Sequence, residues 1–317
     1  MENFISALPS AISQGLIWGI MAIGVYITFR ILDVSDLTVD GSFCTGGVTF
    51  VVLFSGGMNI WLAMACAFLV GMLTGLVTGL LHTFCGIPAI LAGILTQLGL
   101  WSVNLAIMSM KANVSINVIN KESLDKLLVS LRFVQDVAKG DRPFTQHPIF
   151  VVGLFTLVII AILYWFFGTE LGCSMRATGS NPNMARAQGI NTDRNKVLAL
   201  MIANGLVALS GSLLAQFQSY GDINMGRGAI VIGLAAVIIG EVVFGKIFRN
   251  FGLKLLAVSL GAVIYYVVIQ AVLSFGQINS NYLKLISATI VAVCLSVPYW
   301  KGKYMTKPVK HGGAHHA

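Results

Sequence analysis

The chain has 317 residues, of which 56% are hydrophobic and only 10% are charged, and its mean hydropathy is +0.85. Soluble domains carry about a quarter charged residues, and the charges here are clustered so that long stretches contain none, which excludes a soluble fold. The formal net charge of +8 comes largely from Lys and Arg in connections between apolar segments, a pattern typical of membrane proteins and not of nucleic-acid binding.

Apolar segments are expected, in chain order, at about 10–31, 41–57, 59–81, 86–108, 149–168, 195–217, 228–245, 252–276 and 283–300. About 20 apolar residues suffice for a helix to cross a bilayer. Because backbone groups in hydrocarbon must bond to one another, these segments are expected to be helices. The sequence therefore predicts an all-α polytopic membrane protein with about nine apolar segments, forming a single transmembrane domain over residues 1–317.

Two of these segments, 41–57 and 228–245, are short and interrupted by glycine. Each follows an acidic, polar stretch, DVSDLTVD before the first and SYGDINM before the second. Paired short segments of this kind in a transporter indicate two related halves with a solute path near the membrane midplane. We therefore expect two structurally related halves.

The connections divide by charge. Basic residues mark the connection 169–194, the connection between the seventh and eighth segments, and the tail 301–317. Because positive charge accumulates on the cytoplasmic side, these parts are expected in the cytoplasm and the N-terminus outside. The connection 109–148 is then extracellular, with a short amphipathic helix within Lys121–Val137, where Leu residues recur at helical spacing.

The cytoplasmic connection contains a short predicted helix, Asn181–Gln188. Asn181 is expected to cap its start and Pro182 to occupy its first position, while Gly189 is placed to end it. A short rigid helix that protrudes from the membrane is suited to receive force from a separate motor protein.

Polar and aromatic residues within or beside the spans are candidates for the solute path, since a buried amide in lipid must face protein or water. For any single residue the alternative is a hydrogen bond between helices, and Asp36 and Asp40 are alternatively expected to cap helices or to pair with Arg30. Phe43 is a candidate contact for a flat apolar solute. The candidates are Asp36, Asp40, Phe43, Asn104, Asn204, Gln216, Asn224, Tyr265 and Gln270.

The cytoplasmic connection resembles the coupling loop of ABC import permeases of the branched-chain amino acid and ribose type. The shared pattern is Arg176, Ala177, Gly179, Asn181, Ala185, Ala187, Gly189 and Ile190. A second stretch, LDVSDLTVDGSF, is similar to the Asp-Leu-Ser-Val-Gly-Ser signature of the sugar-transporting branch, with Asp40 inserted. This variant looks like a subgroup of amino acid importers whose suspected substrates include tryptophan or tyrosine.

The resemblance implies a bacterial cell-membrane importer built from a second permease copy, two cytoplasmic ATP-binding subunits and an external substrate-binding lipoprotein. It also implies contact with the ATPase through Arg176, Gly179, Asn181, Pro182, Ala185, Arg186 and Gly189. The chain itself is expected to bind no metal or cofactor and to be no enzyme, with ATP and Mg used by the partner. Its one phosphate-loop-like stretch, GEVVFGK, is followed by Ile247 where a Ser or Thr would hold Mg²⁺.

Other functions remain open from the residues alone. A gradient-driven transporter or channel for a small metabolite usually has acidic residues at the midplane, and several of the segments have none. A ribose or nucleoside permease and an intramembrane enzyme are further alternatives. For the enzyme, His82 and His147 are the only histidines outside the tail, and neither belongs to an obvious triad.

Overall fold

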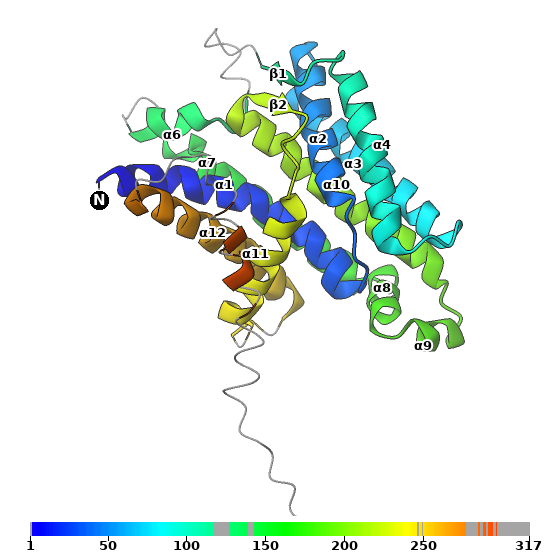
Figure 1. Cartoon of the computed structure of the whole chain (residues 1–317). Coiled ribbons are helices and arrows are strands. Elements are labelled where there is room, and N and C mark those ends of the chain that lie inside the picture. The colour runs from blue at the N-terminus through cyan, green and yellow to red at the C-terminus, as the bar shows by residue number, and fades with distance from the viewer. Residues whose placement is uncertain are drawn as a thin grey trace, which may run out of the picture.

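The computed structural model describes residues 2–116, 127–138, 143–245, 247–248 and 250–276, together with isolated positions between 285 and 296. Within these residues, six helices are long and apolar enough to cross a membrane (Figure 1). They are α1 (Glu2–Tyr26, continued by the π-helical turn η1, Ile27–Ile31), α3 (Ile60–Thr83), α4 (Ala89–Ile107), α7 (Pro148–Gly168), α10 (Thr192–Gln218) and α12 (Phe251–Gly276).

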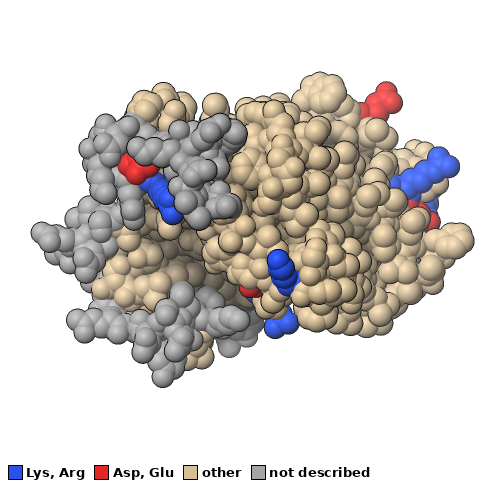
Figure 2. Space-filling view, turned by 90° about the horizontal axis from the view of Figure 1, so that it is seen from above, with Lys and Arg blue, Asp and Glu red and all other residues tan. Residues whose placement is uncertain are grey.

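Two shorter apolar helices, α2 (Val39–Ser55) and α11 (Ala229–Phe244), correspond to the glycine-interrupted segments. The all-α polytopic class is thereby confirmed. The ninth predicted segment, 283–300, lies mainly outside the described residues, as does the tail 301–317. Figure 2, which views the molecule from above, shows few charged side chains among the described residues on the visible face.

Helix α10 lies at the centre and packs against α1, α2 and α3, while α1 also packs against α11 and α12. Small residues permit this contact. A Cβ atom added at Gly71 would lie 2.6 Å from the carbonyl oxygen of Asn204, and one at Gly75 would lie 2.3 Å from that of Leu200. In lipid, where no hydrophobic force drives helices together, such close backbone approach supplies much of the packing energy.

The connections gather at two ends of the bundle. One end, here called the α9 end, carries α8 (Glu170–Ser180), α9 (Pro182–Ala187) and the α3–α4 and α11–α12 connections. The opposite end, here called the ribbon end, carries the antiparallel strand pair of β1 (Asn113–Ser115) and β2 (Tyr220–Asp222). Figure 1 shows β1 and β2 at the top of the view and α8 and α9 at the lower right.

The helix expected within Lys121–Val137 differs from the observed one. Residues 117–126 lie outside the described part of the chain, and the ribbon end carries α6 (Leu131–Ala138), followed by the 3₁₀ turn η2 (Phe144–Gln146). Leu131 is exposed, whereas Phe133 and Val134 are buried. The leucine spacing therefore predicted a helix in this region but misplaced its apolar face, since the packing partner comes from α1 and α7.

Helices α2 and α11 begin inside the bundle, which explains their length. The Ser42 hydroxyl, in the first turn of α2, bonds to Thr74 and Asn204, which lie near the middle of α3 and α10. The first turn of α11 lies against the start of α2, because Gly228 and Ile230 donate backbone hydrogen bonds to Asp40. Each short helix is thus preceded by non-helical chain that enters the bundle, and parts of that chain, such as Asp36 and Ile223, are buried in protein.

Each of the two histidines outside the tail has its Nδ1 atom within hydrogen-bond distance of a nearby backbone group. The Nδ1 atom of His147 accepts a hydrogen bond from the Ile149 amide at 3.2 Å and caps α7. Burial lowers the pKa of His147, which favours the neutral ring that can accept this bond. The Nδ1 atom of His82 lies 2.9 Å from the Ile87 carbonyl oxygen in the α3–α4 turn. These contacts give each histidine a structural role.

Candidate functional site

The protruding helix α9 has a fully built cap at each end. Asn181 accepts a hydrogen bond from the Met184 amide, and Pro182 occupies the first helical position. At the other end, the Gly189 amide bonds to Arg186 and the Ile190 amide bonds to Ala185. Gly189 has φ +80°, so this is a Schellman ending with glycine at the left-handed position. The helix and its caps are as the sequence predicts.

Nearly all of α9 faces outward. Ala185 is its one buried residue, and Met184 is 63% exposed. Arg186 connects α9 to the start of α10, donating to the Thr192 hydroxyl at 2.8 Å and lying 3.3 Å from the Asp193 carboxylate. Helix α9 is therefore exposed over most of its surface while remaining joined to the central helix of the bundle.

Helix α8 joins α9 to the transmembrane helices. A Cβ atom at Gly179 would lie 1.8 Å from the carbonyl oxygen of Ile31, so α8 lies directly on the end of η1. Asn195 of α10 donates to both Ser174 and Thr178 of α8. Displacement of α9 would accordingly be transmitted to α10 through hydrogen bonds and to the end of α1 through close backbone packing.

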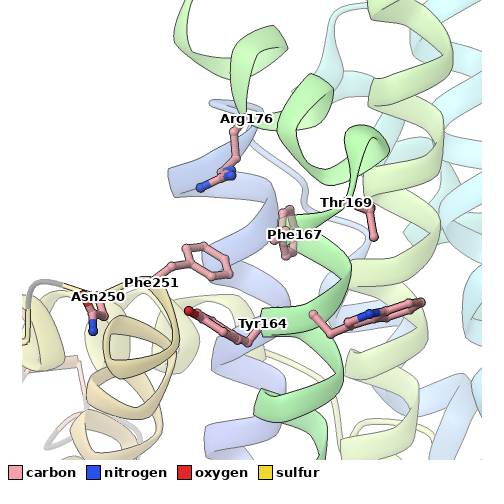
Figure 3. Close-up of a pocket in the computed structure, with 8 residues that line it drawn as sticks. Tyr164, Phe167, Thr169, Arg176, Asn250 and Phe251 are labelled. Carbon is pink, nitrogen blue, oxygen red and sulfur yellow. The ribbon is translucent and has the colours of Figure 1, made fainter.

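Arg176 lies on α8 and contacts the start of α12. Its guanidinium carbon lies 5.8 Å from the ring centroid of Phe251, at the start of α12. Figure 3 shows Arg176, Tyr164, Phe167 and Phe251 around one cavity between α7, α8 and α12. This cavity has a volume of about 520 Å³. The structure thus separates Arg176 from most of the other candidate coupling residues: Gly179 lies on α8 against η1, and the rest lie on α9 or at its ends.

Asp36 and Asn204 lie in a buried polar network that joins four helices. Asp36 accepts hydrogen bonds from the Thr38 amide at 2.9 Å and the Asn204 side chain at 2.7 Å. Ser42 donates to Asn204 at 2.6 Å, and its hydroxyl lies 2.7 Å from that of Thr74. A further pair of bonds connects Thr38 through Thr78 to Thr96 on α4. In this conformation both residues hold helices together.

Asp40 caps α11. Its two carboxylate oxygens accept from the Gly228 and Ile230 amides, each at 2.9 Å. A carboxylate is favourable there because the amides at a helix start are unpaired and carry partial positive charge. The capping alternative is thus confirmed for Asp40. The pairing alternative is wrong, because Arg30 bonds to Glu241 at 2.9 Å.

Asp40 and Asn104 also line a second cavity of about 260 Å³ between α2, α4 and the segment that follows β2. Its other polar and aromatic lining residues include Gln97, Trp101 and Arg227. Asn104 is 1% exposed, and its Oδ1 atom has no hydrogen-bond partner in the described part of the chain. A buried amide oxygen left unpaired costs about 1–3 kcal/mol, so this atom is suited to accept a bond from a visiting polar group.

The other candidate path residues are dispersed. Phe43 is fully buried and stacks on Trp18 at 4.8 Å, and Tyr265 is fully buried against Tyr266. Gln216 is buried on α10, whereas Asn224 is exposed beside Asp222 at the ribbon end. Gln270 is half-buried and donates to Ser274.

Sequence reasoning missed Arg227 and Trp101. Arg227 stands between two glycines directly before an apolar helix, and this position of a charge beside a broken span was a usable signal. Trp101 carried no comparable signal, because the cavity that it lines with Asn104 of α4 is closed by residues of α2 and of the segment after β2, which are distant in the sequence. The lining of the cavity between α2 and α4 therefore includes the predicted residues Asp40 and Asn104, together with others, such as Trp101 and Arg227, that the structure adds.

Comparison with known proteins gives consistent results. Residues 8–295 match the family described as branched-chain amino acid transport system / permease component. The tyrosine transport system permease protein of Clostridioides difficile is 36% identical over 291 residues, which cover 92% of this chain and 91% of that protein. An uncharacterized protein of Rickettsia prowazekii is 32% identical over 295 residues, covering 91% of this chain and 96% of that protein.

Two further proteins are more distant. An autoinducer 2 import system permease protein of Yersinia pestis is 27% identical over 229 residues, which cover 70% of this chain and 58% of that protein. The solved structure of PsaBC from Streptococcus pneumoniae in complex with Fab aligns with a TM-score of 0.53 and 15% identity, covering 95% of this chain and 99% of that chain. At this identity the alignment concerns the fold alone.

Proposed function

This chain belongs to the permease family of branched-chain amino acid transport systems, and from that premise we propose that it is the membrane subunit of an ATP-driven amino acid importer, with tyrosine as its first candidate solute. The proposal rests mainly on α9, a helix capped at both ends that buries one residue. It is joined to the end of α1 through α8 and to α10 through Arg186. An ATPase that moved α9 would move those helices with it.

The proposed complex contains a second copy of this permease, two cytoplasmic ATP-binding subunits that use ATP and Mg, and an external substrate-binding protein at the ribbon end. The permease binds no cofactor and hydrolyses no nucleotide. ATP binding acts by stabilising one permease conformation over another. In that transition the contacts of α8 with η1 and α10 carry the displacement toward the buried network around Asp36 and Asn204.

The cavity between α2 and α4 is the proposed solute contact. An amino acid carries a carboxylate, which Arg227 could pair, and an ammonium group, which could donate to the unpaired Asn104 oxygen. Trp101 would contact an aromatic side chain through its ring face. These residues lie around one cavity of about 260 Å³. In the proposed dimer the solute path runs between the two permease copies, and this cavity holds part of the solute.

We further propose that α2 and α11 are the corresponding elements of two related halves. Each is short, each follows non-helical chain that enters the bundle, and the start of α11 is capped by a residue of α2. Such paired half-length helices in transporters surround the solute site. The full set of nine segments is part of the same proposal.

The proposed orientation puts the α9 end in the cytoplasm and the N-terminus outside. Cys85 and Cys173 are exposed at the α9 end, which allows a direct test. Variants that retain one of these cysteines, treated in intact cells with a membrane-impermeant maleimide, should be labelled only after permeabilisation. Labelling of both cysteines in intact cells would show that the α9 end lies outside the cell.

The function itself is tested by reconstitution. The permease is placed in proteoliposomes with its ATPase and binding protein, and uptake of labelled tyrosine, leucine and ribose is compared with and without ATP. Tyrosine uptake that requires ATP is the expected result. Uptake that persists without the ATPase, driven by a proton or sodium gradient, would favour a secondary transporter, and ATP-driven uptake of ribose alone would reassign the solute.

A further inference from the structure

Two adjoining cavities open at the α9 end of the bundle. The first, of about 520 Å³, lies between α7, α8 and α12. The second, of about 410 Å³, lies between η1, α8 and α12, and the two share Arg176 and Phe251. Both volumes are within the range of about 300–1,000 Å³ found for ligand pockets. Neither cavity contains the proposed solute contacts or α9.

The lining of these cavities is basic. It contains Arg30, Arg176 and Lys254, and no Asp or Glu from the described residues. Arg30 is already paired with Glu241. Arg176 contacts the Phe251 ring and the Cys173 sulfur, and neither it nor Lys254 has a carboxylate partner in the part of the chain that the structure describes. Arg176 and Lys254 thus line the second cavity together with Phe251, and neither charge is neutralised by a described carboxylate.

The aromatic side chains place this site at the membrane surface. Tyr164 and Trp165, in the last turns of α7, are 57% and 72% exposed beside the first cavity. Exposed Tyr and Trp at the ends of spanning helices lie at the level of lipid headgroups. Phe251 and Lys254 are three residues apart on α12 and therefore share a face of that helix. Apolar rings and cations occur together where a lipid offers both acyl chain and phosphate.

We propose that these two cavities bind the headgroup of an anionic phospholipid from the leaflet at the α9 end. Arg176 and Lys254 pair with the phosphate oxygens, while Tyr164, Trp165 and Phe251 contact the glycerol and the first acyl carbons. Basic pockets between transmembrane helices on the cytoplasmic side suit acidic headgroups. The proposal rests on the orientation given under the proposed function. A bound lipid would connect α12 to α8, the helix that leads to α9.

The test uses the full-length chain in nanodiscs of phosphatidylcholine containing a minor fraction of spin-labelled phosphatidylglycerol. The measured quantity is the fraction of labelled lipid immobilised by the protein, compared with spin-labelled phosphatidylcholine. The wild-type chain should immobilise phosphatidylglycerol preferentially. Lys254→Gln and Arg176→Gln should each weaken that preference about fivefold, the effect of one cation beside an anionic lipid. Arg194→Gln removes an exposed cation at the same end but outside both cavities, and it should leave the preference unchanged.

Several outcomes would overturn the assignment. One is equal immobilisation of the two lipids by the wild-type chain, and another is a loss in Arg194→Gln as large as in Lys254→Gln. Competition by inorganic phosphate as effective as that by phosphatidylglycerol would make this a site for soluble anions. Displacement of the lipid on adding the ATPase would make it a protein interface. A thermal melt of each variant identifies misfolding, and Lys254→Arg should restore the preference.

This readout requires no transport. Failure of tyrosine uptake with lipid preference intact would count against the importer alone. Loss of lipid preference with ATP-dependent uptake intact would count against the lipid site alone. If thiol labelling showed the opposite orientation, the leaflet at the α9 end would be the outer one, and the assignment to a cytoplasmic anionic lipid would be wrong.

Discussion

Replacing Gly189 with valine tests whether the ending of α9 matters for transport. Gly189 has φ +80° and nothing lies within 4 Å of an added Cβ atom, so the change introduces backbone strain and no steric clash. A left-handed conformation costs an L residue roughly 1–2 kcal/mol. If position 189 leaves that conformation to relieve the strain, the two hydrogen bonds of the Schellman ending are lost, each worth about 0.5–1.5 kcal/mol.

A loss of about 2 kcal/mol corresponds to roughly a 30-fold change in an equilibrium constant. Helix α9 has six residues and buries only Ala185, and helices this short are marginal without tertiary contacts. The last turn of α9 should therefore be largely unfolded in Gly189→Val. We expect tyrosine uptake per ATP hydrolysed to fall about tenfold or more in proteoliposomes, with the transmembrane bundle still folded.

The matched control is Gly86→Val. Gly86 has φ +69°, also has nothing within 4 Å of an added Cβ atom, and lies in the α3–α4 connection at the same end. It carries the same kind of strain but no connection to α9. Gly189→Asn is a second control, since asparagine tolerates the left-handed region better than other residues. Wild-type coupling in Gly189→Val, or equal uncoupling in Gly86→Val, would refute the role given to α9.

Three further changes test the packing. Gly179→Ala places a Cβ atom 1.8 Å from the Ile31 carbonyl oxygen. This clash should push α8 away from η1 and uncouple ATP hydrolysis from uptake. The control Gly168→Ala adds a Cβ atom in open space and should behave as wild type. Asp40→Asn loses one of two charge-assisted hydrogen bonds to the start of α11 and should lower the free energy of unfolding by about 1.5–3 kcal/mol; an unchanged Tm would contradict the cap. Gln216→Met removes a fully buried amide with neither side-chain atom bonded in the described structure, and should raise stability by about 1–3 kcal/mol; a lower Tm would show that the amide is satisfied.

The sequence by itself determined the helices and the ends of α9. Hydropathy over about 20 residues is a local property, and so are the caps made by Asn181, Pro182 and Gly189, because each cap bonds to backbone within a few residues. The predicted boundaries of the second to eighth segments accordingly lie within three residues of those observed, whereas α1 begins at Glu2, eight residues before the predicted start, and the ninth segment lies mainly outside the described residues. The amphipathic pattern within Lys121–Val137 was less informative, because the buried face of α6 depends on its neighbours.

Only the tertiary structure decided which polar groups meet. Asp40 bonds to amides 188 and 190 residues away, Asn204 donates to Asp36 across 168 residues, and Arg30 pairs with Glu241 across 211. Several partners were available to each charge in the sequence, and helix packing selects one of them. The cavity between α2 and α4 and the basic cavities at the α9 end arise in the same way, since their walls come from segments that are distant in the chain and adjoin only after the bundle has folded.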